Sequence, residues 1–166
     1  MSYLLLCLCL IPFMAVTQEN QDQELDEIYV TATRLSALLR DSARSVSIID
    51  QEQIQNATQK LALDEILAGV PGLYMQNRYN FAQDLRISLR GFGARSAFGI
   101  RGIKVIVDGI PETLPDGQAG VNSIDLGSAK RIEVIRGPAS SHYGNAAGGV
   151  IAIESESGRN PAFIQT

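Results

Sequence analysis

Short segments in which apolar and polar residues alternate recur along this 166-residue chain. A period of two is typical of half-buried β-strands, and several of these segments are rich in valine and isoleucine, which favour strands. The pattern predicts six strands, over residues 45–49, 73–76, 85–90, 103–107, 131–135 and 150–153.

Two other stretches follow a helical pattern. Asp50, with Gln53 three residues later, is typical of a helix N-terminus, and we expect a short helix through Ile54. In residues 61–68 the apolar residues share one helical face, and Gly69 is expected to end that helix. The apolar face of the second helix is expected to pack on the sheet.

Glycine is concentrated in the second half of the chain, where twelve of the fifteen glycines fall between Gly91 and Gly149. Glycine adopts conformations that other residues disfavour, so this density is typical of long loops. Asp108-Gly109 between apolar runs predicts a hairpin turn. Gly137-Pro138 predicts that the preceding strand ends sharply and that a single helical turn follows around residues 140–143.

An apolar run from Leu4 to Val16, interrupted only by Pro12, is too short to span a bilayer and turns polar after Thr17. It predicts a signal peptide over residues 1–17, although no Lys or Arg follows the first residue. The alternative is a buried element at the start of the core. Both cysteines lie inside this run, so the exported chain is expected to carry no disulfide.

Residues 18–27 are polar and acidic, which predicts a flexible segment. The next six residues favour an extended strand: Ile28, Tyr29, Val30, Thr31, Ala32 and Thr33. No other strand pattern lies nearby, so we expect this strand to have no partner within the chain. Residues 18–44 are therefore expected to form a flexible segment, and residues 45–153 a folded domain.

Composition and motifs exclude several classes of function. A formal net charge of −4 supplies no basic surface for nucleic acid. With one histidine, and no cysteine after residue 17, a zinc site lacks ligands, and we expect neither a metal nor another cofactor. Gly91-Phe92-Gly93 fails as a dinucleotide motif because the next glycine is Gly99. No catalytic pattern surrounds His142, so an enzyme is not expected.

Three segments carry a family resemblance. The first is Val70-Pro71-Gly72-Leu73, the second runs through Ile87-Ser88-Leu89-Arg90-Gly91-Phe92 to residues 103–111, and the third spans residues 132–151. In this order and spacing they resemble the plug domain of TonB-dependent outer-membrane receptors, with the likeness extending over residues 28–153. The resemblance implies an α+β fold, with a small mixed β-sheet, two short helices and long glycine-rich loops, which fills the lumen of a β-barrel.

The run that begins at Asp26 is similar to the TonB box of this family, the strand that binds the C-terminal domain of TonB. The residues implied in TonB binding are Glu27, Ile28, Tyr29, Val30, Thr31 and Ala32. A strand on a flexible tether suits β-augmentation, in which backbone hydrogen bonds join it to the edge of a partner's sheet. The alternative is an ordinary first strand of the folded domain.

Arg90 and Arg136 each end an apolar strand immediately before a glycine, where the guanidinium would project out of the domain. In the resembled family, arginines at these two motif positions bridge to glutamates on the inner barrel wall. The resemblance therefore implies that both lock the plug to the barrel. The alternative is a pair of solvated surface arginines.

The resemblance also implies that loops at the outward tips of the plug contact the transported ligand. The candidate contacts are Arg78, Tyr79, Phe81, Arg95, Phe98 and Gln118. Aromatic rings beside arginines suit a flat anionic ligand, such as a ferric siderophore or similar iron chelate. The alternative for each residue is a solvated loop tip.

The family implies a location in the outer membrane of a Gram-negative cell, with the plug in the barrel lumen and the N-terminus in the periplasm. A barrel needs many alternating segments of about ten residues. Residues 154–166 are interpreted as the start of a linker to it, so we expect the barrel to be absent from this sequence, as in a fragment or a truncated reading frame. The alternative function is a stand-alone periplasmic module that binds a ligand or a protein.

Overall fold

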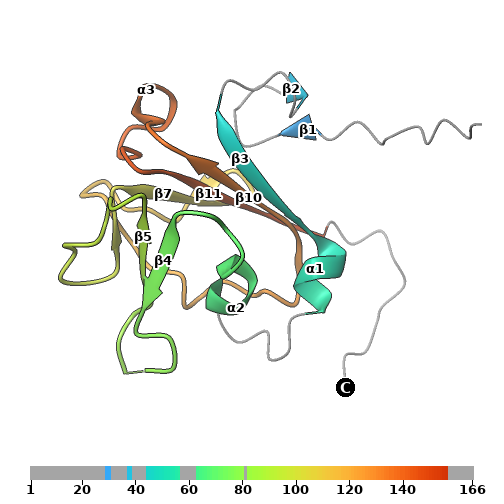
Figure 1. Cartoon of the computed structure of the whole chain (residues 1–166), viewed down its shortest axis with the longest axis horizontal. Helices are drawn as coiled ribbons and strands as arrows, with labels where there is room; N and C mark the ends of the chain where they lie inside the picture. Colours follow the sequence, from blue (N-terminus) through green and yellow to red (C-terminus); the bar gives the residue numbers. More distant parts are fainter. Residues whose placement is uncertain (1–28, 31–36, 39–43, 57–62, 81, 157–166) are drawn as a thin grey trace, which may run out of the picture.

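The computed structural model describes residues 29–30, 37–38, 44–56, 63–80 and 82–156. Its centre is a five-stranded sheet in the order β3-β10-β11-β7-β8 (Figure 1). These strands are β3 Ser45–Asp50, β7 Ile103–Val107, β8 Ile110–Pro111, β10 Ala129–Arg136 and β11 Gly149–Ser155. β10 pairs antiparallel with β3 and β11, whereas β11 pairs parallel with β7. The sheet is therefore mixed, as the resemblance implied.

The alternation of side chains along β10 gives the sheet two apolar faces. Ile132 and Val134 pack with Ile151 of β11 in the larger core. Ile135 packs with Val150 in a smaller core on the opposite face. The β10–β11 pair is therefore the buried centre of the domain.

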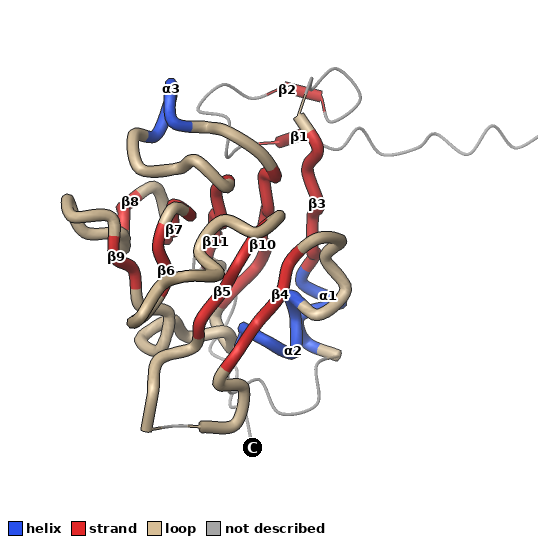
Figure 2. Tube along the Cα trace, turned by 60° about the vertical axis from the view of Figure 1, so that its left-hand side comes forward, coloured by secondary structure: helices blue, strands red, loops and turns tan. Residues whose placement is uncertain are grey.

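The larger core is closed by two helices and a hairpin, namely α1 Gln51–Gln55, α2 Leu63–Leu67, β4 Leu73–Gln76 and β5 Arg86–Leu89. Figure 2 shows the hairpin crossing in front of the β10–β11 pair, with α1 and α2 beside it. Ile54 of α1, Leu67 of α2 and Leu89 of β5 are each 0% exposed. The apolar face predicted for the second helix is thus buried against the sheet and hairpin.

The smaller core lies under the segment that contains α3, Ser140–Tyr143. Ala139, Tyr143 and Ala146 pack on Ile135 and Val150 of the sheet. This single helical turn follows Gly137-Pro138, which confirms the predicted stop and turn.

Each of the six predicted strands has a counterpart at the expected place. The hairpin between β7 and β8 turns at Asp108 (φ 49°) and Gly109 (φ 81°), as predicted. α1 begins directly after Asp50, but the Asp50 side chain makes no capping hydrogen bond to the described residues. The two-residue strands β6 Ile100–Arg101 and β9 Gln118–Ala119 were not predicted, because two residues show no alternation.

The expectation that the N-terminal strand lacks a partner within the chain is wrong. β1, Tyr29–Val30, pairs antiparallel with β2, Ala37–Leu38, and belongs to a separate sheet from the central one. The proposed signal peptide over residues 1–17, and the residues after 156, lie outside the described part of the chain. Among the described residues, no helix has the length and apolar character needed to cross a membrane.

Candidate functional site

The two arginines predicted to lock the domain are held by one turn. Arg90 follows β5 with a φ of 52°, and its amide donates a hydrogen bond to the carbonyl oxygen of Gly72 over 2.8 Å. Arg136 ends β10, and its Nη1 donates to the carbonyl oxygen of Pro71 over 3.3 Å. The Pro71-Gly72 turn therefore brings together two arginines from different sheets. We call Arg90 and Arg136 the arginine pair.

The arginine pair retains donors that the described residues do not use. Arg90 is exposed, and no described residue accepts a hydrogen bond from its guanidinium. Its Nη1 lies 3.7 Å from the point where a Cβ on Gly137 would stand, beside Arg136. Arg136 Nε is buried without a hydrogen-bond partner among the described residues. The exposed guanidinium of Arg90 can therefore be reached by an acceptor from outside the domain, whereas the buried Nε of Arg136 cannot be reached unless its side chain moves.

The loop between β4 and β5 carries Arg78 and Tyr79, two of the predicted ligand contacts. Arg78 Nε donates to Asp64 Oδ2 of α2 over 3.0 Å, and this hydrogen bond raises the pKa of Arg78 above its ordinary value. Arg78 Cζ lies 5.8 Å from the centroid of the Tyr79 ring. Asn77 Nδ2 donates to the carbonyl oxygen of Asp84 over 3.3 Å and closes the loop.

A groove of about 400 Å³ separates this loop from the loop that precedes β6. Asn77, Asp84 and Arg86 line it from the hairpin, and Phe98, which is 73% exposed, lines it from the other loop. Arg86 Nη2 donates to the carbonyl oxygen of Ala94 over 3.0 Å and so joins the two walls. The groove therefore has a polar wall and an aromatic wall.

The predicted ligand contacts are only partly gathered around this groove. Phe98 lines it, whereas Arg78 and Tyr79 lie next to its margin at Asn77. Arg95 is exposed in the same loop as Phe98. Gln118 does not line the groove, but its side chain lies beside Gly99, which does, and it accepts a hydrogen bond from Arg101 Nη2 over 3.2 Å. Phe81 lies outside the described residues.

Sequence reasoning missed the polar residues that shape this region. Asp64 holds Arg78, and Asp84 Oδ1 accepts a hydrogen bond from Asn122 Nδ2 over 2.6 Å. Both contacts attach the loop between β4 and β5 to residues elsewhere in the sequence, for which the sequence offers no periodic signal. Only Asp64 could have been suspected, as a carboxylate beside the apolar stripe of a predicted helix.

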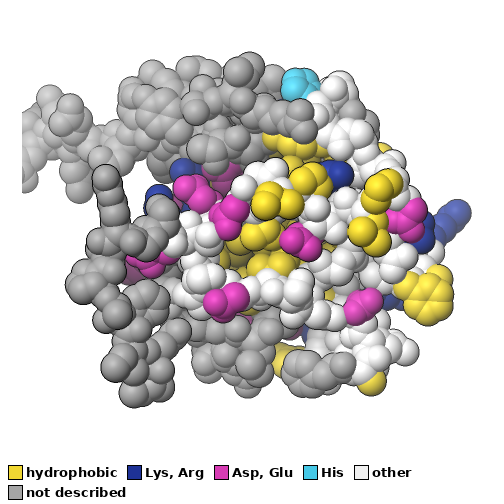
Figure 3. Space-filling model, turned by 180° about the vertical axis from the view of Figure 1, so that it is seen from behind, with side chains coloured by type: hydrophobic (Ala, Val, Ile, Leu, Met, Phe, Trp, Pro, Cys, Tyr) yellow, Lys and Arg dark blue, Asp and Glu magenta, His cyan; other side chains and the backbone are white. Residues whose placement is uncertain are grey.

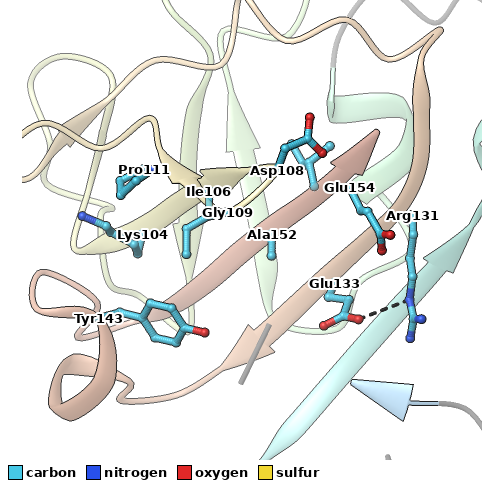
Figure 4. Close-up of a pocket in the computed structure, with 11 residues that line it drawn as sticks. Lys104, Ile106, Asp108, Gly109, Pro111, Arg131, Glu133, Tyr143, Ala152 and Glu154 are labelled. Atoms are coloured by element: carbon cyan, nitrogen blue, oxygen red, sulfur yellow. Dashed lines mark ion pairs between the residues drawn. The ribbon is translucent and has the colours of Figure 1, made fainter. Parts of the chain in front are cut away.

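A second hollow, of about 370 Å³, lies on the sheet face opposite the hairpin. In Figure 3 apolar side chains form a strip on this side of the molecule, with acidic side chains around it. Figure 4 shows Ile106 and Ala152 between Lys104 at one end and the Arg131–Glu133 ion pair at the other, whose Nε and Oε1 atoms are 3.2 Å apart. Among the described residues, no cluster of three or more His, Cys, Asp or Glu side chains could hold a metal ion.

Comparison with known proteins gives a consistent result. Residues 38–150 match the family model described as TonB-dependent Receptor Plug Domain. The chain is 30% identical over 132 residues to a vitamin B12 transporter of Vibrio vulnificus, a match that covers 79% of this chain and 21% of that protein. It is 32% identical over 143 residues to a hemin receptor of Yersinia enterocolitica, covering 84% and 19%. The chain spans about a fifth of the length of these curated relatives.

Solved structures show the same similarity. The ferric yersiniabactin uptake receptor of Yersinia pestis matches with a TM-score of 0.55 and 28% identity, covering 69% of this chain and 17% of that one. A mutant of the ferric enterobactin receptor of Pseudomonas aeruginosa, in complex with enterobactin, matches with a TM-score of 0.51 and 29% identity, covering 69% and 18%. In both, the matched part is a small portion of a much longer chain.

Proposed function

Because the chain belongs to the plug domain family of TonB-dependent receptors, we propose that it is the plug that gates ligand uptake through an outer-membrane receptor. The matched residues 38–150 contain the hairpin, both helices that cover the larger core and most of the central sheet. Proteins of this family are receptors and transporters, and the chain is not an enzyme. The observation that carries the proposal is the arginine pair, because a plug must be held by groups outside itself.

In the proposed receptor, Arg90 and Arg136 bridge to glutamates on the inner wall of a barrel. The unused donors of the exposed Arg90 support this role, since guanidinium groups bind carboxylates through two parallel hydrogen bonds. The contact of Arg136 with Pro71 also supports it, because the side chain is oriented before a partner arrives.

The test of the locking role is a full-length receptor that carries Arg90→Ala and Arg136→Ala together. We expect it to assemble in the membrane but to leak small solutes or to signal abnormally. Lys130→Ala is the matched control, because Lys130 is an exposed cation at the opposite end of β10 from Arg136. Permeability and transport equal to those of the parent receptor would count against the locking role.

We also propose that the strand from Glu27 to Ala32 binds the C-terminal domain of TonB by β-augmentation. The strand character of Tyr29–Val30 supports this, because the two residues already take part in a β-ladder. Proline at Tyr29 or Val30 removes a backbone donor and should abolish capture of that TonB domain. Persistent capture by both proline variants would contradict the assignment.

For the ligand, we propose an iron chelate such as a ferric siderophore, bound across the groove between Asn77 and Phe98. The names of the relatives support a small-molecule ligand, since they include a hemin receptor and a structure in complex with enterobactin. Phe98→Ala in a full-length receptor should weaken binding of haemin or ferric enterobactin by about tenfold, the amount expected for one aromatic contact. Ile110→Ala is the control, because Ile110 is also exposed, at 67%, but lies outside the groove. Equal effects of the two substitutions would contradict this site.

A further inference from the structure

The ion pair between Asp64 and Arg78 joins a buried carboxylate to an exposed loop. Asp64 is a carboxylate that is only 4% exposed, because it lies beside the buried apolar residues of α2. Burying a carboxylate is unfavourable unless it is paired, and Arg78 supplies that pairing through Nε at 3.0 Å. Because α2 packs into the larger core, Asp64 is a fixed point to which the loop is attached.

The loop backbone on both sides of Arg78 is held in an uncommon conformation. Asn77 has a φ of 62° and Tyr79 a φ of 143°, a range that residues other than glycine rarely adopt. Such conformations persist only where the surroundings impose them. The Asp64 contact and the hydrogen bond from Asn77 to the Asp84 carbonyl oxygen constrain this loop, together with backbone hydrogen bonds from the amides of Tyr79 and Asn80 to the carbonyl oxygen of Asn77.

The contact with Asp64 leaves most donors of Arg78 unused. It engages Nε, and no described residue accepts a hydrogen bond from Nη1 or Nη2. The side chain of Arg78 remains 41% exposed, and the adjacent residue Tyr79 is 74% exposed. We call the Arg78 guanidinium and the Tyr79 ring the Arg78–Tyr79 platform.

We propose that Asp64 is a positioning residue that presents the Arg78–Tyr79 platform, already ordered, to a carboxylate group on a flat, aromatic ligand. This inference rests on the proposed uptake function. The two Nη groups can bind one carboxylate through parallel hydrogen bonds, while the tyrosine ring stacks on the adjoining aromatic plane. A free arginine side chain loses much rotamer entropy when it is fixed, so its prior attachment to Asp64 strengthens binding by about tenfold.

The experiment uses full-length receptors and two probes, haemin and haemin dimethyl ester. The two probes share the porphyrin plane, but only haemin carries free carboxylates. The variants are Asp64→Asn, Arg78→Gln and their combination, with Lys130→Gln as the control, because Lys130 is an exposed cation in β10 that does not line the groove. Arg78→Lys serves as a second variant that keeps the positive charge but lacks the planar guanidinium with its two Nη groups. Because Arg78 is exposed, this substitution leaves the core of the domain unchanged.

We expect Asp64→Asn and Arg78→Lys each to weaken haemin binding about tenfold and dimethyl ester binding less than twofold. The combined variant should bind haemin no more weakly than Arg78→Gln alone, because Asp64 acts only through Arg78. Equal losses for both probes, or additive losses in the combined variant, would overturn the positioning role. A parent receptor that captures TonB but binds haemin no better than its ester would overturn the carboxylate platform and leave the proposed plug function standing. Failure to capture TonB and to transport any ligand would instead contradict the proposed function.

Discussion

Asp108 accepts two hydrogen bonds from Ser155, one from the backbone amide over 2.7 Å and one from the hydroxyl over 2.6 Å. Asp108 lies in the turn after β7, and Ser155 is the last residue of β11. The amide of Asp108 also donates to the carbonyl oxygen of Ile153 over 2.9 Å. The turn residue thus ties the end of β11 to the neighbouring strand, beyond the role in the turn that the sequence indicated.

This contact predicts a pH-dependent contribution to stability. The hydrogen bonds from Ser155 lower the pKa of Asp108 below its ordinary value. The stabilisation is therefore present above the unfolded-state pKa and is lost as pH falls through the lower pKa of the folded state. Asp108→Asn should lower the free energy of unfolding at pH 7 by about 0.5–1 kcal/mol, a value reduced for solvent exposure. Thermal unfolding at pH 7 and pH 3 measures the difference between the two proteins.

The difference should be smaller at pH 3 than at pH 7, because pH 3 lies below the ordinary pKa of the unfolded-state carboxyl and the stabilisation is being lost there. Glu112→Gln is the control, because Glu112 is also an exposed acidic residue near this hairpin. A difference between the parent and Asp108→Asn that stays constant from pH 7 to pH 3 would contradict the assigned cause. Asparagine tolerates the positive φ of 49° at this position, so backbone strain does not confound the comparison.

Gly93 predicts a large effect from a small substitution. It has a φ of 85°, and a Cβ added to it would stand 2.8 Å from the carbonyl oxygen of Ile87 and 2.9 Å from that of Arg101. Gly93→Ala should therefore lower the free energy of unfolding by about 2–4 kcal/mol, from backbone strain and the close contacts together. Gly120→Ala should change it by less than about 1 kcal/mol, because no atom lies within 4 Å of the added Cβ. Urea unfolding of the two variants tests this, and equal effects would contradict it.

The strands of the central sheet could be predicted because the alternation of apolar and polar residues is contained within each strand. In residues 131–135 the alternation between Ile132 and Val134 on one face and Glu133 on the other follows directly from the pleat of a strand. The order of the strands was not predictable in the same way. β7 and β11 pair in parallel, although β8, β9 and β10 lie between them in sequence. No pattern within either strand identifies the other as its neighbour.

In the candidate site, too, some residues could be predicted from the sequence, whereas their contacts could not. Arg90 and Arg136 could be found from their positions before glycines, but their shared attachment to Pro71-Gly72 depends on the packing of two sheets. Asp64 was missed because its partner, Arg78, lies across a loop and is identified only by a side-chain contact. Chemically informative residues are thus visible in the sequence, whereas their partners depend on tertiary structure.

The larger core predicts where apolar substitutions destabilise the domain most. Ile132, in the central strand β10, is 0% exposed, whereas Ile110, in the edge strand β8, is 67% exposed. Ile132→Ala should lower the free energy of unfolding by about 2–5 kcal/mol through lost burial and a residual cavity. Ile110→Ala should change it by less than about 0.5 kcal/mol. Urea unfolding gives both values, and a comparable loss at the two sites would contradict the assignment of the core.

The ladder between β1 and β2 predicts competition for the strand that is proposed to bind TonB. Tyr29 pairs with Leu38 and Val30 with Ala37, so β2 occupies one edge of β1. An isolated two-stranded ladder is marginally stable, and releasing it should raise the fraction of chains available to a partner.

Ala37→Pro with Leu38→Pro should therefore strengthen binding of the TonB C-terminal domain by about two- to fivefold, as measured by calorimetry. Ala37→Val with Leu38→Val is the matched control, because valine favours the strand and should leave binding unchanged or slightly weaker. Weaker binding of the proline variant would show that β2 orders β1 for its partner, and competition would then be excluded.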